Sequence, residues 1–311
     1  MKRRLLGHTG HEVSVMGLGG AAIGQQYGEV SFSEADRCVR AAIDGGINLI
    51  DTSAYYGQGR SEEWLGRILA SGLREQIILC TKAGRLDVAT FDFSAKGFRK
   101  CLEGSLQRLQ TDHVDILLAH DIEYADDLEQ VFTETAECLR LLKKQGKCRF
   151  IGMSGLPLGL LGRAIERCEL DVVISYSHFT LQNQRLLNQL LPTATEHGVG
   201  VLNASPLCLG LLTNQGPPPW HPGSAELKAI ARKAADHCRE RGSDISFLGM
   251  QYCLQDDRIT STITGTSRRE ELDMNLRALT TPIDRQLLAE VQAILEPVRD
   301  QTWPSGNWRG D

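Results

Sequence analysis

The stretch IDTSAYYG, residues 50–57, decides the fold, because it joins a buried strand to chemically active side chains. The apolar run INLI leads into Asp51, and Tyr56 follows closely. Two later apolar runs end in the same way, QIILC shortly before Lys82 and VDILLA directly before His120. In a parallel sheet buried on both faces, successive strand ends lie on one rim. A rim of convergent ionisable groups is where barrel enzymes perform their chemistry.

A strand-like run followed by a helical pattern recurs along the whole chain. Eight alternating units without a linker or composition break predict a (β/α)8 TIM barrel, with residues 1–311 as a single domain. Two doubly wound domains are the alternative, although no boundary between them is visible. Strands are expected near residues 13–19, 47–52, 76–82, 114–119, 148–154, 171–177, 198–204 and 260–265.

Helix boundaries and two additional segments complete this prediction. Ser33, with Asp36 three residues later, is expected to open the first helix, and Gly45-Gly46 to close it. An apolar stripe of helical period at 128–142 predicts another helix that ends at Gly146. A long loop at 207–224, rich in Pro and Gly, and a helix-like stretch at 283–296 with its tail to 311 fall outside the repeat. Long loops in a barrel usually cover the active face.

Composition excludes several classes of protein. The net charge of −5 is spread evenly, so no nucleic-acid partner and no polybasic membrane anchor are expected. No run approaches the roughly 18 apolar residues of a membrane span, and a cytoplasmic protein is expected. Nine cysteines without C-x-x-C spacing favour buried, reduced thiols over disulfides or a metal site. The oligomeric state does not follow from the sequence.

One motif suggests a different fold. GLGGAA at 17–22 matches the G-x-G-x-x-A of a dinucleotide-binding turn, with Asp51 at the end of the next strand. However, AAIGQQYGEVS intervenes before the helix, and Asp51 lies well beyond the ~20 residues expected. We interpret the segment as the first loop of a barrel. Its glycines either bring the backbone close to a ligand or form a plain flexible loop.

Several motifs in order resemble the aldo-keto reductase superfamily over nearly the whole chain. They are GLGG, DTSAYYGQGRSEEWLG, TKAGR, SLQRLQTDHVDILLAHD, GKCRFIGMSG, ASPLCLGLLT and ITGTS followed by Asn275. Within the superfamily, HDIE, RFIGMSGLPL, ISYSHFTLQN and LLTNQGPPPWHP are most similar to members that oxidise L-galactose, L-fucose and related aldoses. The resemblance therefore implies a barrel enzyme that uses a nicotinamide cofactor on a small sugar.

The resemblance assigns catalytic roles to Tyr56, Lys82, Asp51 and His120. A tyrosine hydroxyl titrates near ~10, and a lysine beside it is expected to lower that pKa. Asp51 would hold Lys82 charged, and a neutral His120 would donate a hydrogen bond to the substrate oxygen. Tyr56 would then take the proton of the sugar C1 hydroxyl while hydride leaves C1, which yields a lactone. Structural roles are the alternative for three of them: Asp51 as a turn cap, Lys82 in an ion pair at the barrel end, and His120 as a core histidine.

The cofactor contacts also follow from the resemblance. Ser154 is expected to bond the carboxamide, and Gly155 stands where most relatives have Asn, so one amide contact is missing. Tyr176 takes the place of the usual Gln, and Phe179 is expected to stack on nicotinamide, with His178 as the alternative. The remaining expected contacts are Ser205, Leu207, Gly210, Gly265, Thr266, Ser267, Glu271 and Asn275.

The segment ITGTSRREELDMN predicts the choice of cofactor. NADP-dependent relatives place a Lys and an Arg where Gly265 and Glu271 stand. A carboxylate ~5 Å from the 2′-phosphate would cost roughly 3 kcal/mol per unit charge at an effective dielectric of about 20. NAD is therefore expected, unless Arg268 or Arg269 turns toward a phosphate instead of lying in solvent.

The predicted function is NAD-dependent oxidation of an aldose at C1. Tyr55, His120, Trp220 and His221 are the expected substrate contacts, the last two presented by the proline-restricted loop GPPPWHP. Packing of Trp220 onto the barrel is the alternative for that residue. Two other functions remain open: an NADPH-dependent carbonyl reductase, and a regulatory subunit that binds dinucleotide without turnover.

Overall fold

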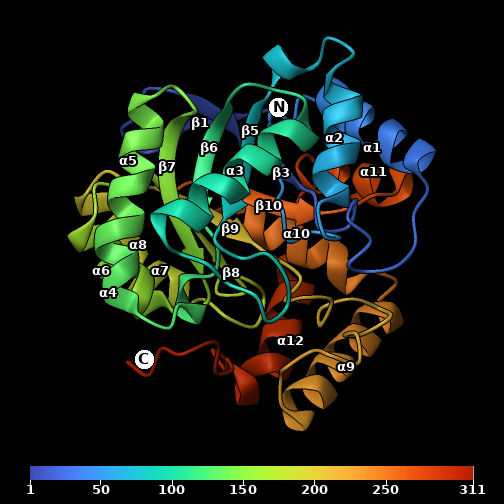
Figure 1. Ribbon diagram of the computed structural model, residues 1–311. Coiled ribbons are helices and arrows are strands. Elements are labelled where there is room, and N and C mark those ends of the chain that lie inside the picture. Colours follow the sequence, from blue (N-terminus) through green and yellow to red (C-terminus); the bar gives the residue numbers. More distant parts are fainter. Residues whose placement is uncertain (311) are drawn as a thin grey trace.

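Eight parallel strands close into a barrel in the computed structural model, which describes residues 1–310 (Figure 1). The strand order around the barrel is β10-β3-β4-β5-β6-β7-β8-β9, so each strand pairs with its neighbours in sequence and the last closes on the first. Every strand expected from the sequence overlaps one of these, which confirms the (β/α)8 TIM barrel. The strands are β3 Met16–Gly19, β4 Leu49–Asp51, β5 Ile78–Ala83, β6 Val114–Ala119, β7 Cys148–Gly155, β8 Val172–Tyr176, β9 Gly200–Ala204 and β10 Ser261–Gly265.

Helices pack on the outside of the barrel and bury their apolar faces against it. The surrounding helices are α1 Phe32–Asp44, α2 Arg60–Leu69, α3 Ala95–Leu109, α4 Leu128–Gln130, the π-helical turn Val131–Thr135, α5 Ala136–Lys144, α6 Leu158–Arg167, α7 Arg185–Gln189, α8 Leu191–Glu196, α10 Ile245–Gln255 and α11 Arg269–Ala278. Short 3-10 turns occupy Arg74–Gln76, Ile122–Tyr124 and Glu296–Val298. All nine cysteines are buried and unpaired.

The first helix begins two residues earlier than expected. Ser31 is its N-cap and accepts from the Glu34 amide, while the Glu34 carboxylate accepts from the Ser31 amide. The prediction of Ser33 with Asp36 is wrong, because Ser31 with Glu34 forms the complete reciprocal capping box. The predicted end at Gly45 and Gly46 is confirmed.

A hairpin that sequence reasoning missed closes the amino-terminal end of the barrel. Strands β1 Arg3–Leu5 and β2 Glu12–Ser14 pair antiparallel, and the run predicted at 13–19 therefore holds parts of two strands. Leu6 and Val13 belong to the apolar cluster that fills the barrel interior. The hairpin thus seals the end opposite the strand tips.

Alternation along the strands places apolar side chains in the interior and polar ones at the carboxyl rim. Residues two apart on a strand share a face. The interior cluster contains Leu49, Cys80 and Leu118, and the residues two positions later are Asp51, Lys82 and His120. The inward-facing side of each strand thus carries apolar side chains in the barrel interior and a polar side chain at the mouth.

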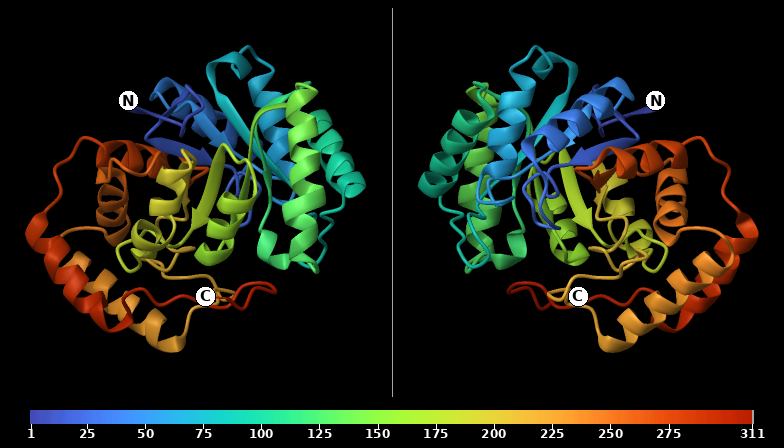
Figure 2. Two further views of the ribbon diagram at one scale, coloured as in Figure 1. Left: turned by 90° about the vertical axis from the view of Figure 1, so that its left-hand side faces the viewer. Right: turned by 90° about the vertical axis from the view of Figure 1, so that its right-hand side faces the viewer.

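Two additional helices form a separate layer near the barrel mouth. Helices α9 Ala225–Glu240 and α12 Arg285–Leu295 lie side by side in all views and share a second apolar cluster (Figures 1 and 2). The predicted stretch 283–296 is thus a helix, and the tail after it runs back across the barrel (Figure 2). Among residues 1–310, no helix combines the length and apolarity that crossing a bilayer requires.

Candidate active site

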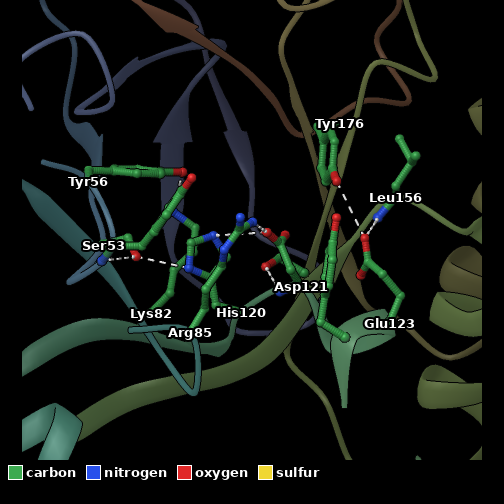
Figure 3. A network of polar contacts seen from close by, with 12 residues as sticks. Ser53, Tyr56, Lys82, Arg85, His120, Asp121, Glu123, Leu156 and Tyr176 are labelled. Atoms are coloured by element: carbon green, nitrogen blue, oxygen red, sulfur yellow. Dashed lines mark hydrogen bonds and ion pairs between the residues drawn. The ribbon is translucent and has the colours of Figure 1, made fainter. Parts of the chain in front are cut away.

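Lys82 is the centre of the hydrogen-bond network at the barrel mouth. Its Nζ lies 2.7 Å from the Asp51 carboxylate, 2.8 Å from the Thr52 carbonyl oxygen and 3.2 Å from the Tyr56 hydroxyl. Both charged groups are buried, so each depends on the other for compensation. The structure thus brings together Asp51, Tyr56 and Lys82 as the sequence predicted, and Figure 3 shows Tyr56, Lys82 and His120 converging.

Two glycines fix the position of Tyr56. Gly24 of the first loop lies against the backbone of Tyr56, and a Cβ on Gly24 would come within 2.7 Å of the Tyr56 carbonyl carbon. Gly57 faces Gly24 from the other side, in a left-handed conformation with φ of 63°. Gly24 of the first loop and Gly57 therefore allow close packing of two backbone segments, of which one carries the tyrosine.

Ser53, which sequence reasoning missed, orients His120. Its Oγ accepts from the Tyr55 amide at 3.1 Å and lies 2.9 Å from His120 Nδ1. The Tyr55 amide leaves the hydroxyl hydrogen of Ser53 free to donate to Nδ1, and in that arrangement the imidazole proton lies on Nε2. A serine two residues after Asp51 carries no motif of its own. Only the fold brings it beside the histidine.

His120 is neutral, as expected. Burial and the neighbouring cations Lys82 and Arg85 hold its pKa well below the usual range. The His120 ring stands edge-on to the rings of Tyr55 and Tyr56, with centroids 6.0 Å and 5.8 Å away. A neutral imidazole with Nε2–H directed away from Ser53 can donate to a substrate oxygen without taking its proton.

The net pKa shift of Tyr56 is opposite to the expected one. Burial raises the pKa of its hydroxyl, and the charge of Lys82 offsets only part of that rise. The phenol therefore holds its proton at neutral pH in this structure. The predicted effect of Lys82 is present, but desolvation outweighs it.

Two of the segments expected to bind the dinucleotide follow β9 and β10. Ser205, Cys208, Leu209 and Gly210 all have left-handed backbones, with φ from 50° to 89°. Within this turn the Cys208 amide donates to the Ser205 carbonyl at 2.8 Å, and the Gly210 amide donates to the Leu207 carbonyl at 3.2 Å. At the other end, Asn275 donates to Thr264, and its Oδ1 is buried without a hydrogen bond among residues 1–310. An unpaired buried amide oxygen at the position predicted to contact adenine fits a ligand with an N–H donor.

Glu271 is tied to the residues expected at the 2′ end of the cofactor. Its carboxylate accepts from Thr266 Oγ1 at 2.7 Å, one residue beyond Gly265. Of the two nearby arginines, Arg269 is 2.8 Å from Asp273 on the exposed face of α11. Ser267 is buried beside them. The Glu271 carboxylate is thus fixed close in sequence and space to Gly265 and Thr266.

The two rings considered for nicotinamide stacking are both buried away from open space. Phe179 is 2 % exposed, belongs to the cluster between barrel and helices, and packs on Tyr252 of α10 with centroids 5.5 Å apart. His178 is also buried, and burial lowers its pKa to about 3. Its Nε2 lies 3.3 Å from the hydroxyl of Thr302 in the tail. This packing does not favour the predicted stacking role of Phe179.

Ser154 lies between the catalytic strand end and the cofactor side. Its hydroxyl accepts from the Asp121 amide at 3.2 Å and donates to the Ala119 carbonyl at 3.4 Å. The next residue, Gly155, leaves room for Glu123, since a Cβ there would lie 2.6 Å from Glu123 Oε2. The glycine at 155 therefore makes space for the Glu123 carboxylate, which the sequence did not reveal.

Glu123 connects the barrel rim to the tail. Its Oε1 accepts from the Leu156 amide at 3.0 Å, Ser305 Oγ at 2.9 Å and Tyr176 Oη at 3.4 Å (Figure 3). The Asn307 amide donates to its backbone oxygen at 2.6 Å. Burial, and then the charge of Asp121, raise the pKa of Glu123 to about 7.

On the substrate side, the loop 207–224 carries one exposed and one enclosed candidate. Trp220 is 55 % exposed and faces Tyr27 of the first loop, with centroids 6.0 Å apart. His221 is buried: its Nε2 contacts the Cys208 carbonyl at 3.0 Å, and its Nδ1 accepts from the Gly223 amide. Both ring nitrogens of His221 are used within the loop, which does not favour the predicted sugar contact.

Comparison with known proteins shows the family to which the chain belongs. Residues 15–296 match the aldo/keto reductase family. The chain belongs to that family. It is 45% identical to L-galactose dehydrogenase of Arabidopsis thaliana, covering 97% of each chain, and 35% identical to D-arabinose 1-dehydrogenase of Saccharomyces cerevisiae, covering 85% of this chain and 82% of the relative.

A solved aldo-keto reductase has the same architecture. The chain superimposes on AKR11C1 from Bacillus halodurans, in its holo form, with a TM-score of 0.78 and 25% identity, covering 99% of this chain and 100% of the other. Members of the family are oxidoreductases that use nicotinamide dinucleotides. The buried Lys82 network thus lies at the mouth of an aldo-keto reductase barrel.

Proposed function

We propose that this aldo-keto reductase oxidises an aldose of the L-galactose or L-fucose type at C1 to the lactone, with NAD as cofactor. The observation that carries the proposal is the Asp51–Lys82–Tyr56 network beside a neutral His120, in a chain that is 45% identical to an L-galactose dehydrogenase. The alternative of a regulatory subunit without turnover is disfavoured by an intact proton-transfer centre.

Each residue of the centre has a distinct part in the reaction. When bound, a nicotinamide dinucleotide supplies the hydride acceptor for C1. The Tyr56 hydroxyl, as phenolate, takes the proton of the C1 hydroxyl, and Lys82 stabilises the phenolate charge. His120 donates from Nε2 to the same oxygen and orients it. Asp51 compensates the buried charge of Lys82, so that Lys82 stays protonated throughout.

Residues that would hold the cofactor lie on β7 and β8, in the turn after β9 and on α11. Ser154 and Tyr176 are the candidates at the carboxamide, the left-handed turn 205–210 at the pyrophosphate, and Asn275 at the adenine. Leu207 belongs to that turn, and its partly buried side chain packs against the core. Glu271 and Gly265 support the preference for NAD over NADP.

Carbonyl reduction with NADPH is the second candidate, and one observation favours it. Burial holds the proton on Tyr56, which suits a general acid that protonates a carbonyl oxygen. Glu271 disfavours the 2′-phosphate of NADPH. The two functions differ in cofactor and in direction, so one assay separates them.

The test is a panel of free aldoses with NAD and with NADP, followed by the absorbance of the reduced nicotinamide. We expect turnover of L-galactose or L-fucose with NAD and at least tenfold lower kcat/KM with NADP, as a repulsion of about two decades predicts. Equal use of NADP would contradict the electrostatic argument. Reduction of simple carbonyls by NADPH with no sugar oxidation would establish the second candidate.

A paired substitution tests the cofactor assignment separately. Replacing Gly265→Lys and Glu271→Arg together removes a repulsion and adds charge-assisted hydrogen bonds to a 2′-phosphate. The ratio of Kd for NADP to Kd for NAD should fall by tenfold or more in fluorescence titrations. Glu166→Gln, at an exposed carboxylate on α6, is the control and should leave the ratio unchanged.

A further inference from the structure

Asp121, the residue directly after the catalytic histidine, is buried at the mouth of the site without a role in the reaction described above. Its Oδ2 lies 3.7 Å from His120 Nε2, the nitrogen that faces the substrate oxygen. Its amide donates to Ser154 Oγ at 3.2 Å. The carboxylate therefore stands between the group that holds the C1 oxygen and the side of the site expected to hold the cofactor.

The backbone of Asp121 is held in an uncommon conformation. It has φ of 51° and ψ of 61°, in the left-handed region that Asp and Asn tolerate better than other non-glycine residues. This turn directs the carboxylate toward His120, whereas a residue continuing the strand would point outward. Such a conformation persists only where surrounding contacts hold it, and non-glycine residues of this kind cluster at functional sites.

Arg85 holds one oxygen of this carboxylate. Its Nη1 donates to Asp121 Oδ2 (Figure 3). The guanidinium lies 3.9 Å from the centroid of the Tyr55 ring, and 5.4 Å and 5.3 Å from the centroids of Phe91 and Tyr124, which stack 4.8 Å apart. Three rings thus fix the cation in place, which lowers the entropy cost of using it for recognition.

The other oxygen of Asp121 is available. Oδ1 has no hydrogen bond within residues 1–310, and yet it is not sealed from solvent. Burial raises the pKa of Asp121, and the Arg85 cation offsets part of that rise. A buried carboxylate with one oxygen held by arginine and the other unused is a strong acceptor for a hydroxyl donor.

We propose that Asp121 binds the hydroxyl on C2 of the aldose, accepting its hydrogen bond at Oδ1, while Arg85 fixes the carboxylate. This inference rests on the proposed aldose oxidation. His120 Nε2 bonds the C1 oxygen, and the hydroxyl of the neighbouring carbon is the donor that a carboxylate 3.7 Å from that nitrogen can reach. Asp121 is thereby a specificity-determining residue: it selects sugars that carry a C2 hydroxyl over simple aldehydes and 2-deoxy sugars.

A cycle of enzyme and substrate variants tests this contact. We expect wild type to prefer L-galactose over 2-deoxy-L-galactose in kcat/KM by roughly tenfold to a hundredfold, as for a hydrogen bond to a charged acceptor. In Asp121→Ala, L-galactose should lose that factor and the 2-deoxy sugar should lose almost nothing, so the preference falls to about twofold or less. Asp121→Asn retains the left-handed backbone and an acceptor oxygen, and should retain part of the preference.

Asp115 supplies the matched control. It is a buried carboxylate on the same strand, at the opposite end of the barrel, and it pairs with Arg74 at 2.9 Å and Arg149 at 3.3 Å. Asp115→Asn should leave the sugar preference at the wild-type value. Circular dichroism and Kd for NAD show whether each variant folds and binds cofactor, and a misfolded Asp121→Ala leaves Asp121→Asn to decide.

Two different failures are distinguishable. If wild type oxidises L-galactose but the Asp121 variants lose activity equally on both sugars, the carboxylate acts only through the structure and the inference is overturned. If wild type oxidises no aldose at all, the proposed function and this inference fail together.

Discussion

Single side chains determine the proton chemistry of this enzyme through burial. Tyr56 and Lys82 lie in the same network, yet the pKa of Tyr56 is raised because desolvation exceeds the effect of the lysine charge. His120 is kept neutral by burial and by two cations. The effect of a partner on a titratable group therefore depends on how much water both have lost.

Tyr56→Phe should abolish turnover and leave NAD binding nearly intact. The loss in kcat should be at least the ~10²–10⁴ typical of removing a general acid or base. In wild type, sugar oxidation should rise with pH through the alkaline range, because the phenolate is the reactive form and its pKa is raised. Steady-state rates and fluorescence titration measure the two effects. A Phe variant with more than about a tenth of wild-type kcat would refute the mechanism.

Glu123→Gln should stabilise the protein at pH 8 and lose this advantage toward pH 4. The folded pKa is about 7, above the usual 4.5, so the folded state binds more protons than the unfolded state between these values. Wild-type stability therefore falls as pH rises through this window, by an amount on the order of 3 kcal/mol. Gln keeps an acceptor for Leu156 and Ser305 without a charge. Urea denaturation at several pH values measures the difference, and a pH-independent difference would argue against the raised pKa.

At the scale of elements, two neighbouring strand ends and one loop establish the site. The strands β4 and β5 bring Asp51 and Lys82 together, because Asp51 pairs with Cys80 and Lys82 follows Cys80 by two residues on the same face. Tyr56 lies beyond the strand, and its place depends on the contact of Gly24 with the backbone of Tyr56 and Gly57. The packing of the first loop thus positions Tyr56, just as strand register positions Asp51 and Lys82.

Gly57→Ala should lower both stability and kcat. The residue has φ of 63°, and a Cβ would collide with the carbonyl of Gly24. A positive φ alone costs about 1 kcal/mol for alanine, and the collision adds to it. Thermal denaturation and kcat measure the two effects. Gly216→Ala is the control, since it has φ of 77° but open space around its Cβ position; equal losses in both variants would mean that backbone strain alone is responsible.

At the scale of the whole molecule, segments far apart in sequence close the barrel mouth. Tyr27 of the first loop meets Trp220 of the loop before α9, and the tail packs Trp303 against His221 with centroids 5.1 Å apart. Ser305 and Asn307 bind Glu123 on the opposite side. The substrate side is therefore assembled from three regions of the chain.

Trp220→Ala should raise KM for the aldose several-fold and leave Kd for NAD within about twofold, as expected when a substrate contact alone is removed. Trp220 is 55 % exposed, so its ring is available to a sugar. Leu141→Ala, at an exposed apolar position on α5, is the control and should change neither constant. Equal weakening of sugar and NAD would assign Trp220 to the structure of the loop.

The sequence alone determined the barrel, because eight apolar runs alternating with helical patterns leave few other ways to bury both faces of a parallel sheet. It also identified Asp51, Lys82 and His120, since strand ends are readable from local periodicity. The roles of Ser53, Glu123 and Asp121, and the enclosure of Phe179 and His221, were decided only by tertiary structure. Their partners lie on other loops and strands, and pKa shifts such as that of Tyr56 depend on desolvation, which no local pattern encodes.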